Sequence, residues 1–235
     1  MDAPQPALRI DQIVPPYLLT CDLAAFPVRA DAAAAGHWAG AHPPALLGQS
    51  LLWLLAARYY AAASGPDRAP VAFGEGPDLY REVSWMLLTG VFPGFRAQFP
   101  RLWVDASDPL PLELGRAYGF PKEPGSIDWR RSERGLEVTV TDARGVALAL
   151  GCHELRSLPP GLVTFFAALR ADFPSTGHQA QLRLLDARRA ALLRVRRWEA
   201  PRGAQWGLAG GPSLGVWLEG ARLWVGPPEG GGGPE

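Results

Sequence analysis

The strongest constraint on the fold comes from residues 126–155, which read SIDWRRSERGLEVTVTDARGVALALGCHEL. Hydrophobic and polar residues alternate through LEVTVT, as they do in a strand with one buried face. The DARG segment then supplies a tight turn, and VALALGCHEL returns as the partner strand. Such a hairpin is antiparallel, so we expect the fold to be built on antiparallel sheet.

Two further segments add strands and one short helix. YREVSWML (80–87) is rich in aromatic and β-branched residues, which favour a strand. Residues 101–120 predict a strand followed by a short helix, with Asp108 as the N-cap and Pro109 at the first helical position. Strand patterns outnumber helical ones, which indicates an α+β fold of mainly antiparallel sheet with few short helices.

Other stretches can be read in two ways. The apolar residues of 44–63 are nearly continuous, which fits either a helix or a strand buried on both faces. Residues 161–174 and 180–200 are equally open between helix and strand. With 235 residues the chain can form one domain with a real core. We predict a single domain over 1–226 and a disordered Gly/Pro-rich tail over 227–235.

Composition argues against several classes of protein. The 23 basic and 23 acidic side chains give zero formal net charge, which does not indicate a nucleic-acid partner. Two cysteines are too few for a disulfide framework. The longest apolar run, 45–57, is shorter than a bilayer span, and the start of the chain is unlike a secretory signal peptide. We therefore expect a soluble cytoplasmic protein without a membrane partner.

Common cofactor and metal motifs are missing from the sequence. The glycine-rich stretches 73–78 and 207–215 match neither a phosphate-binding loop nor a dinucleotide fingerprint. Cys152, His153 and Glu154 are adjacent on a predicted strand, so their side chains alternate between faces and cannot all reach one metal ion. We expect neither a metal nor a cofactor.

Lys122 is the only lysine of the chain, since every other of the 23 basic side chains is arginine. A coding bias toward arginine explains the missing lysines, and the one that remains is either accidental or required. An amine can lose its proton and act as a nucleophile, whereas a guanidinium cannot. Pro121 and Pro124 hold the segment extended. If Lys122 faces an apolar cavity, desolvation disfavours its charged form.

Two motifs around this lysine resemble the acetoacetate decarboxylase superfamily. LELGRAYGFPK (112–122) is similar to the family signature in which Gly-Arg precedes a Pro-Lys whose lysine forms a Schiff base. GPDLYREV (76–83) is similar to the family's Gly-Pro-Tyr-x-Glu segment, with Glu82 matching the active-site glutamate forty residues before the lysine. WGLAGG (206–211) adds a weaker similarity. The resemblance spans about residues 15–227 in outline.

The resemblance implies a cone- or barrel-like antiparallel β fold, a cofactor-independent Schiff-base lysine and a homo-oligomer. It favours a strand over residues 46–60. It also implies two catalytic residues, Lys122 as the nucleophile and Glu82 as a proton shuttle. Arg116 would grip a substrate carboxylate or brace its loop, and three aromatic side chains would shape the pocket: Tyr80, Tyr118 and Phe120.

Three functions remain open at this point. The first is decarboxylation of a small β-keto acid that resembles acetoacetate. The second keeps the lysine but performs aldol or dehydration chemistry on a pyruvate-like keto acid. The third is a non-catalytic module that binds a small molecule in an apolar pocket.

The sequence also departs from the family pattern. Glu123 stands where the decarboxylase has a second lysine, and Ala117 replaces the glutamate of the family's Gly-Arg-Glu. No clear counterpart of the second active-site glutamate is found, because the corresponding run is LLWLLAARY. A glutamate paired with Lys122 would stabilise the ammonium form. We therefore expect Glu123 to face away from Lys122.

Overall fold

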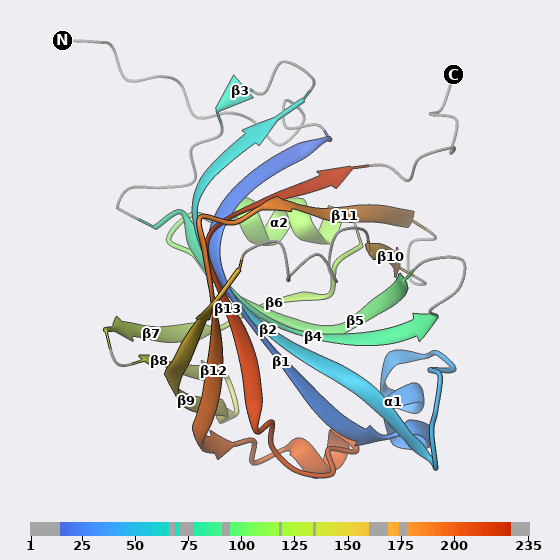
Figure 1. Ribbon diagram of the computed structural model, residues 1–235. Coiled ribbons are helices and arrows are strands. Elements are labelled where there is room, and N and C mark those ends of the chain that lie inside the picture. Colours follow the sequence, from blue (N-terminus) through green and yellow to red (C-terminus); the bar gives the residue numbers. More distant parts are fainter. Residues whose placement is uncertain are drawn as a thin grey trace, which may run out of the picture.

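A computed structural model describes residues 15–65, 69–70, 78–90, 95–117, 119–133, 135–159, 169–173 and 178–226 (Figure 1). Over these ranges the chain is mostly β-strand. It contains two eight-residue α-helices, α1 (Ala32–Ala39) and α2 (Leu110–Ala117), and the 3-10 helix η3 (Gly203–Trp206). The expectation of a sheet-based fold with few short helices is confirmed.

Seven strands of the described chain close into a barrel, because the first of them pairs with both the second and the last. In spatial order they are β1 (Tyr17–Asp31), β2 (Gln49–Ser64), β4 (Tyr80–Gly90), β5 (Phe95–Asp105), β10 (Leu169–Phe173), β11 (His178–Asp186) and β13 (Leu214–Gly226). The short strand β3 (Ala69–Pro70) pairs with the end of β2.

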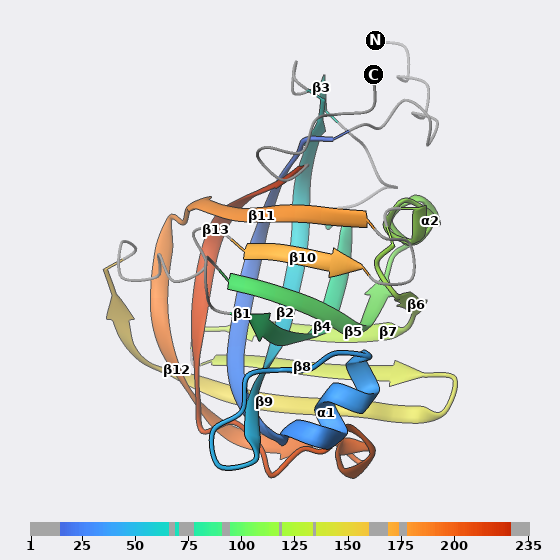
Figure 2. The same ribbon diagram turned by 90° about the vertical axis from the view of Figure 1, so that its right-hand side faces the viewer.

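The sheet is mainly antiparallel, as predicted, and both parallel pairings found in the described chain involve β5. One joins β5 to its neighbour β10 in the barrel wall. The other joins β5 to β6 (Lys122–Pro124), the short strand that begins with the lysine (Figure 2).

Beyond the barrel, β13 continues the sheet through four flanking strands: β12 (Arg189–Glu199), β9 (Gly145–Leu158), β8 (Gly135–Asp142) and β7 (Ser126–Ser132). The predicted hairpin is confirmed, since Asp142 pairs with Gly145 across a two-residue turn. Gly145 has a φ of 94°, a conformation that favours glycine.

The undecided segments form strands over most of their described residues, and none of them forms a helix there. Residues 44–63 contain most of β2, and 180–200 contain β12 and most of β11. Of 161–174, only 169–173 are described, and they form β10. The remainder of that stretch and the predicted tail 227–235 lie outside the described residues.

Helix α2 carries the chain from β5 to β6. Asp108 Oδ1 accepts a hydrogen bond from the Leu110 N–H at 2.8 Å, so its side chain caps the start of α2 as predicted, although the helix begins at Leu110 and not at Pro109. The carbonyl of Pro109 accepts from the Glu113 N–H at 3.0 Å, so Pro109 contributes to the first turn. At the other end Gly119, with a φ of 89°, reverses the chain toward Lys122.

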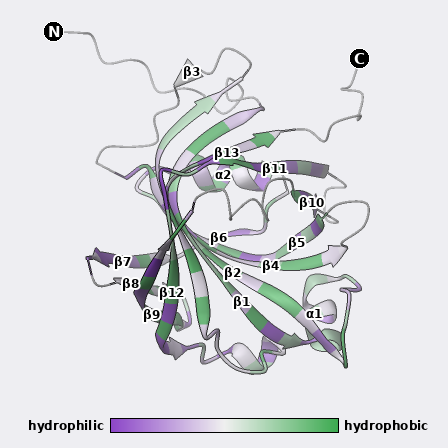
Figure 3. Ribbon diagram, viewed as in Figure 1, coloured by the Kyte–Doolittle hydropathy of each residue, from purple (hydrophilic) through white to green (hydrophobic). Residues whose placement is uncertain are grey.

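Two sets of packed side chains lie on opposite faces of the shared strands. On β4, Val83, Trp85 and Leu87 are buried in a core beneath the flanking sheet. Several tryptophans fill that core, and Trp38 on α1 stacks on Trp206 with ring centroids 5.3 Å apart. The alternate residues of β4 face the barrel interior. Figure 3 shows the resulting hydrophobic stretches along β1, β2 and β4.

Candidate active site

Lys122 and Glu82 meet inside the barrel, although forty residues separate them in the sequence. Strand β5 pairs with both of their strands, placing Leu102 beside Lys122 and Val104 beside Glu82. The Lys122 Nζ lies 3.0 Å from Glu82 Oε2. The two side chains are only 9% and 13% exposed, so the ion pair is largely withdrawn from bulk water.

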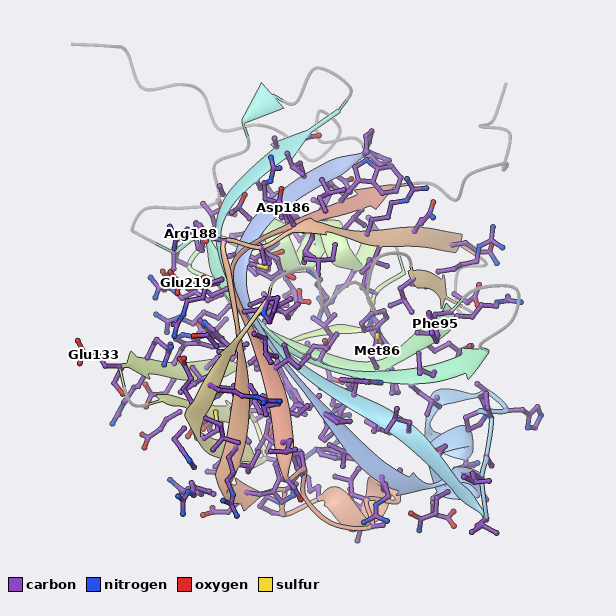
Figure 4. The ribbon with its side chains drawn as sticks, viewed as in Figure 1. Met86, Phe95, Glu133, Asp186, Arg188 and Glu219 are labelled. Atoms are coloured by element: carbon purple, nitrogen blue, oxygen red, sulfur yellow. The ribbon has the colours of Figure 1, made fainter. Side chains whose placement is uncertain are left out.

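The pair borders a cavity of about 550 Å³ within the barrel. Strand alternation sends Tyr80, Glu82, Ser84 and Met86 of β4 into it. Met86 can be located between β4 and β5 in Figure 4. Most of the remaining wall is apolar and comes from β1, β2, β5, α2 and β13: Leu19, Leu23, Leu55, Ala57, Ala62, Phe99, Leu114, Leu223 and Val225.

The hydrocarbon stem of Lys122 passes over Gly115 on α2. A Cβ atom at position 115 would lie 2.1 Å from Lys122 Cδ, so only glycine leaves room for the lysine in this position. The Nζ lies 5.3 Å from the ring centroid of Tyr80 and 5.9 Å from that of Phe120. The amine is therefore held between two aromatic rings and one carboxylate.

A second tyrosine completes the polar end of the cavity. Tyr59 on β2 stacks on Tyr80 with ring centroids 4.5 Å apart. Burial, followed by the nearby Glu82 charge, raises the pKa of both phenols well above its usual value. Both hydroxyls thus stay protonated and can donate hydrogen bonds. Burial also raises the pKa of the neighbouring Cys21 thiol, to which the charges of Asp22 and Glu82 add.

Glu123 faces away from Lys122, as expected. Its Oε1 lies 3.3 Å from an Arg101 guanidinium nitrogen, and its side chain is 45% exposed. Arg101 also lies over the ring of Trp103, 5.7 Å from the centroid. Glu123 is therefore tied to the tryptophan-rich side of β5 rather than to the cavity.

Arg116 is exposed, and its Nε donates a hydrogen bond to the Lys122 carbonyl at 2.9 Å. This contact braces the turn that carries the lysine, which was one of its two expected roles. Contact with a substrate carboxylate stays a prediction. Tyr118, predicted to shape the pocket, lies outside the described residues. Tyr80 and Phe120 do line the cavity.

Several cavity residues were not singled out from the sequence. Gly115 belongs to the quoted Gly-Arg pair, but its contact with the lysine stem depends on how α2 packs on β6. Ser84 and Met86 follow Glu82 at period two, a signal that becomes readable once 80–90 is known to be a strand. Tyr59 lies in segment 44–63, whose sequence pattern fitted either a helix or a strand.

The described part of the chain contains no group of three potential metal ligands. On β2 the residue opposite Glu82 is Ala57. It belongs to the run LLWLLAARY, in which the sequence showed no counterpart of the second glutamate that the family resemblance implied. Among the same residues, no helix is both long and apolar enough to cross a bilayer.

Comparison with known proteins gives matches of structure but not of sequence. No protein-family model and no curated protein matches the chain. An acetoacetate decarboxylase structure matches with a TM-score of 0.64 at 10% identity, covering 91% of this chain and 87% of that one. Acetoacetate decarboxylase from Legionella pneumophila matches with a TM-score of 0.64 at 14% identity, covering 95% and 91%.

A third similar structure is the enduracididine biosynthesis enzyme MppR complexed with pyruvate. It matches with a TM-score of 0.57 at 16% identity, covering 90% of this chain and 88% of that chain. At such identities the likeness concerns the fold. It confirms the fold that the two sequence motifs implied.

Proposed function

We propose that this chain, which has the acetoacetate decarboxylase-like fold, is a cofactor-independent Schiff-base enzyme that decarboxylates a β-keto acid through Lys122. The observation that carries the proposal is the placement of the only lysine at a mainly apolar cavity, 3.0 Å from a carboxylate that is 13% exposed. Transfer of a proton from the ammonium to Glu82 leaves a neutral amine, which is the nucleophilic form.

The reaction begins when Lys122 Nζ attacks the ketone carbon and forms a carbinolamine. The Glu82 carboxylic acid protonates the departing hydroxyl, and loss of water leaves an iminium ion. The bond between the α-carbon and the carboxylate then breaks. Its electron pair moves to the iminium nitrogen, giving carbon dioxide and an enamine. Protonation of the enamine carbon and hydrolysis release the product ketone and restore the amine.

The cavity walls favour the bond-breaking step. Decarboxylation spreads and removes the carboxylate charge, so surroundings that solvate this charge poorly favour the transition state over the ground state. The protonated Tyr59 and Tyr80 hydroxyls can stabilise the oxygen of the carbinolamine as charge develops on it.

A pyruvate-directed aldol or dehydration reaction is the second candidate. Similarity to MppR, whose structures include complexes with pyruvate and with a condensation product of pyruvate and imidazole 4-carboxaldehyde, favours it. Both candidates begin with the same iminium on Lys122, and they differ in the bond that breaks or forms next.

The proposal is tested by trapping this iminium. The protein is incubated with acetoacetate or pyruvate, reduced with borohydride and analysed by peptide mass spectrometry. We expect an adduct on Lys122 that disappears in Lys122→Arg. Release of carbon dioxide from acetoacetate then distinguishes the first candidate from the second. If no keto acid in a panel labels Lys122, the enzymatic proposal is wrong and a binding module is favoured.

A matched pair of variants tests the role assigned to Glu82. Glu82→Gln removes the proton shuttle and should slow adduct formation by about 10²- to 10⁴-fold. Glu123→Gln changes the residue next to the lysine on the opposite face and should alter the rate by less than about threefold, the size of effect expected at an exposed position. Equal losses in both variants would contradict a specific role for Glu82.

A further inference from the structure

The cavity is far larger than its polar end requires. Four of its described polar groups, those of Tyr59, Tyr80, Glu82 and Lys122, gather where β2 and β4 pair, and β11 adds Gln179 and Arg183 elsewhere on the wall. A volume of about 550 Å³ lies in the range of pockets that enclose drug-sized ligands rather than molecules as small as acetoacetate. Most of this volume is therefore available to a part of the substrate other than the keto acid group.

The wall beyond the tyrosines is built from aliphatic side chains in register. Ala62 pairs with Leu19 on β1, Leu19 pairs with Leu223 on β13, and Leu223 pairs with Leu184 on β11. All four side chains line the cavity. Ala62 follows Tyr59 by three residues, so this band of four aliphatic side chains lies about 10 Å further along β2.

A second layer follows at the same end of the barrel. Val225 pairs with both Leu182 and Tyr17, and all three residues line the cavity. Arg183 of β11 also borders the cavity, between Leu182 and Leu184. Its guanidinium stacks over Trp224, 5.3 Å from the ring centroid. Apart from Arg183, the described side chains of this layer offer apolar contacts to a ligand.

We infer that the substrate of Lys122 carries an extended alkyl chain, which lies against the aliphatic band formed by Ala62, Leu19, Leu223 and Leu184. The inference rests on the proposed Schiff-base function and specifies its substrate class, a medium- or long-chain 3-oxo acid. Binding of this chain would displace water from an apolar surface, so affinity should rise with each methylene group.

Stable methyl ketones provide the probes, because they form the same iminium without decarboxylating. The series from acetone to 2-undecanone is incubated with the full chain, reduced with borohydride and analysed for the adduct on Lys122. We expect the half-saturating ketone concentration to fall by about two- to fourfold per added methylene until the cavity is filled.

Two substitutions on β2 locate the chain. Ala62→Phe fills the space beside the aliphatic band and should abolish the gain from chain length beyond 2-hexanone. Ala61→Phe is the matched control, since Ala61 is exposed and does not line the cavity, and it should leave the series as in the parent protein. A chain-length gain that persists in Ala62→Phe would overturn the assigned position.

The outcomes separate this inference from the proposed function. If all ketones label Lys122 at the same half-saturating concentration, the alkyl-chain inference is wrong while the Schiff-base function stands. If neither the ketones nor the keto acids label Lys122, the proposed function is wrong and the inference falls with it. A chain-length gain that Ala62→Phe alone removes supports both.

Discussion

The two faces of strands β2 and β4 differ in how completely they are packed. The face toward β7, β8 and β9 is filled by interlocking tryptophans, with Trp85, Trp103 and Trp217 fully buried. The opposite face borders a cavity of about 550 Å³. The same strands therefore supply a close-packed core on one side and a mainly apolar cavity on the other, separated by the thickness of one sheet.

The polar groups follow the same division. On the packed side Asp142 accepts hydrogen bonds from Arg202, Trp103 and the Arg144 N–H. These contacts are satisfied within the protein and hold strands together. On the cavity side the carboxylate of Glu82 and the amine of Lys122 are exposed to the enclosed space. Removal of either partner there would leave the other largely withdrawn from water without its ion-pair partner, which is costly.

Adjacent leucines on β2 provide the largest test of this comparison. Leu54 is fully buried in the packed core, whereas Leu55 lines the cavity. Leu54→Ala leaves a new void and should lower the free energy of unfolding by about 3–4 kcal/mol. Leu55→Ala enlarges an existing space and should cost about 1 kcal/mol. Urea unfolding measures both, and equal losses would contradict a packed side and an open side.

Replacement of the glycine beneath the lysine should have the next largest effect. Gly115→Ala places a Cβ within 2.1 Å of Lys122 Cδ, so the amine must move. A displacement of about 1 Å costs roughly 100-fold in rate when geometry is critical. Gly90→Ala, where the nearest atom would be 3.5 Å away, is the control. The rate of iminium trapping at Lys122 is the readout, and an unchanged rate in Gly115→Ala would refute the assigned lysine position.

The ion pair between Asp142 and Arg202 on the packed side should make the free energy of unfolding depend on pH. Burial alone would raise the pKa of Asp142, but hydrogen bonds from Arg202 and Arg144 and the nearby Arg202 charge outweigh it and lower that pKa. The stabilisation is present above the ordinary aspartate pKa and disappears as pH falls through the lowered value. Asp142→Asn should therefore cost about 2 kcal/mol at pH 7.

The cost of Asp142→Asn should shrink as the pH is lowered below about 4. In the parent protein Asp142 is then protonated first in the unfolded state and, at still lower pH, in the folded state. Urea unfolding from pH 7 to pH 3 measures this difference. A cost that stays constant over this range would show that the aspartate charge does not contribute.

The smallest expected effect concerns the alkylation of the two cysteines, of which one lies on each side of the sheet. Cys152 lies on the packed side, and burial raises the pKa of its thiol to about 11. Cys21 packs at the cavity end near Tyr59 and Tyr80. A bound ketone should slow alkylation of Cys21 in the native protein by about twofold and leave Cys152 unchanged, since a ligand in the cavity would contact and stabilise only the cavity side. Peptide mass spectrometry after iodoacetamide treatment at pH 8 measures both, and equal slowing would argue against the separation.

Local sequence patterns determined much of the secondary structure. The hairpin over 126–155 was readable because alternation and turn chemistry are both short-range properties. The Asp108 cap was readable for the same reason. The lone lysine between prolines and its motif predicted the candidate nucleophile and the fold, because residue type and a stiff backbone are also local properties.

Tertiary pairing decided what the local patterns left open. Residues 49–63 became a strand because β1 and β4 pair with β2 on its two sides, which no periodicity within the segment can show. Glu82 and Lys122 meet because β5 pairs with the strands of both.

The cavity itself was decided last. Each apolar residue around it has the pattern of a core residue, since a pattern shows only which face of a strand is apolar. Whether that face is filled depends on the volume left when the barrel closes, and this volume belongs to the assembled strands rather than to any segment of the sequence.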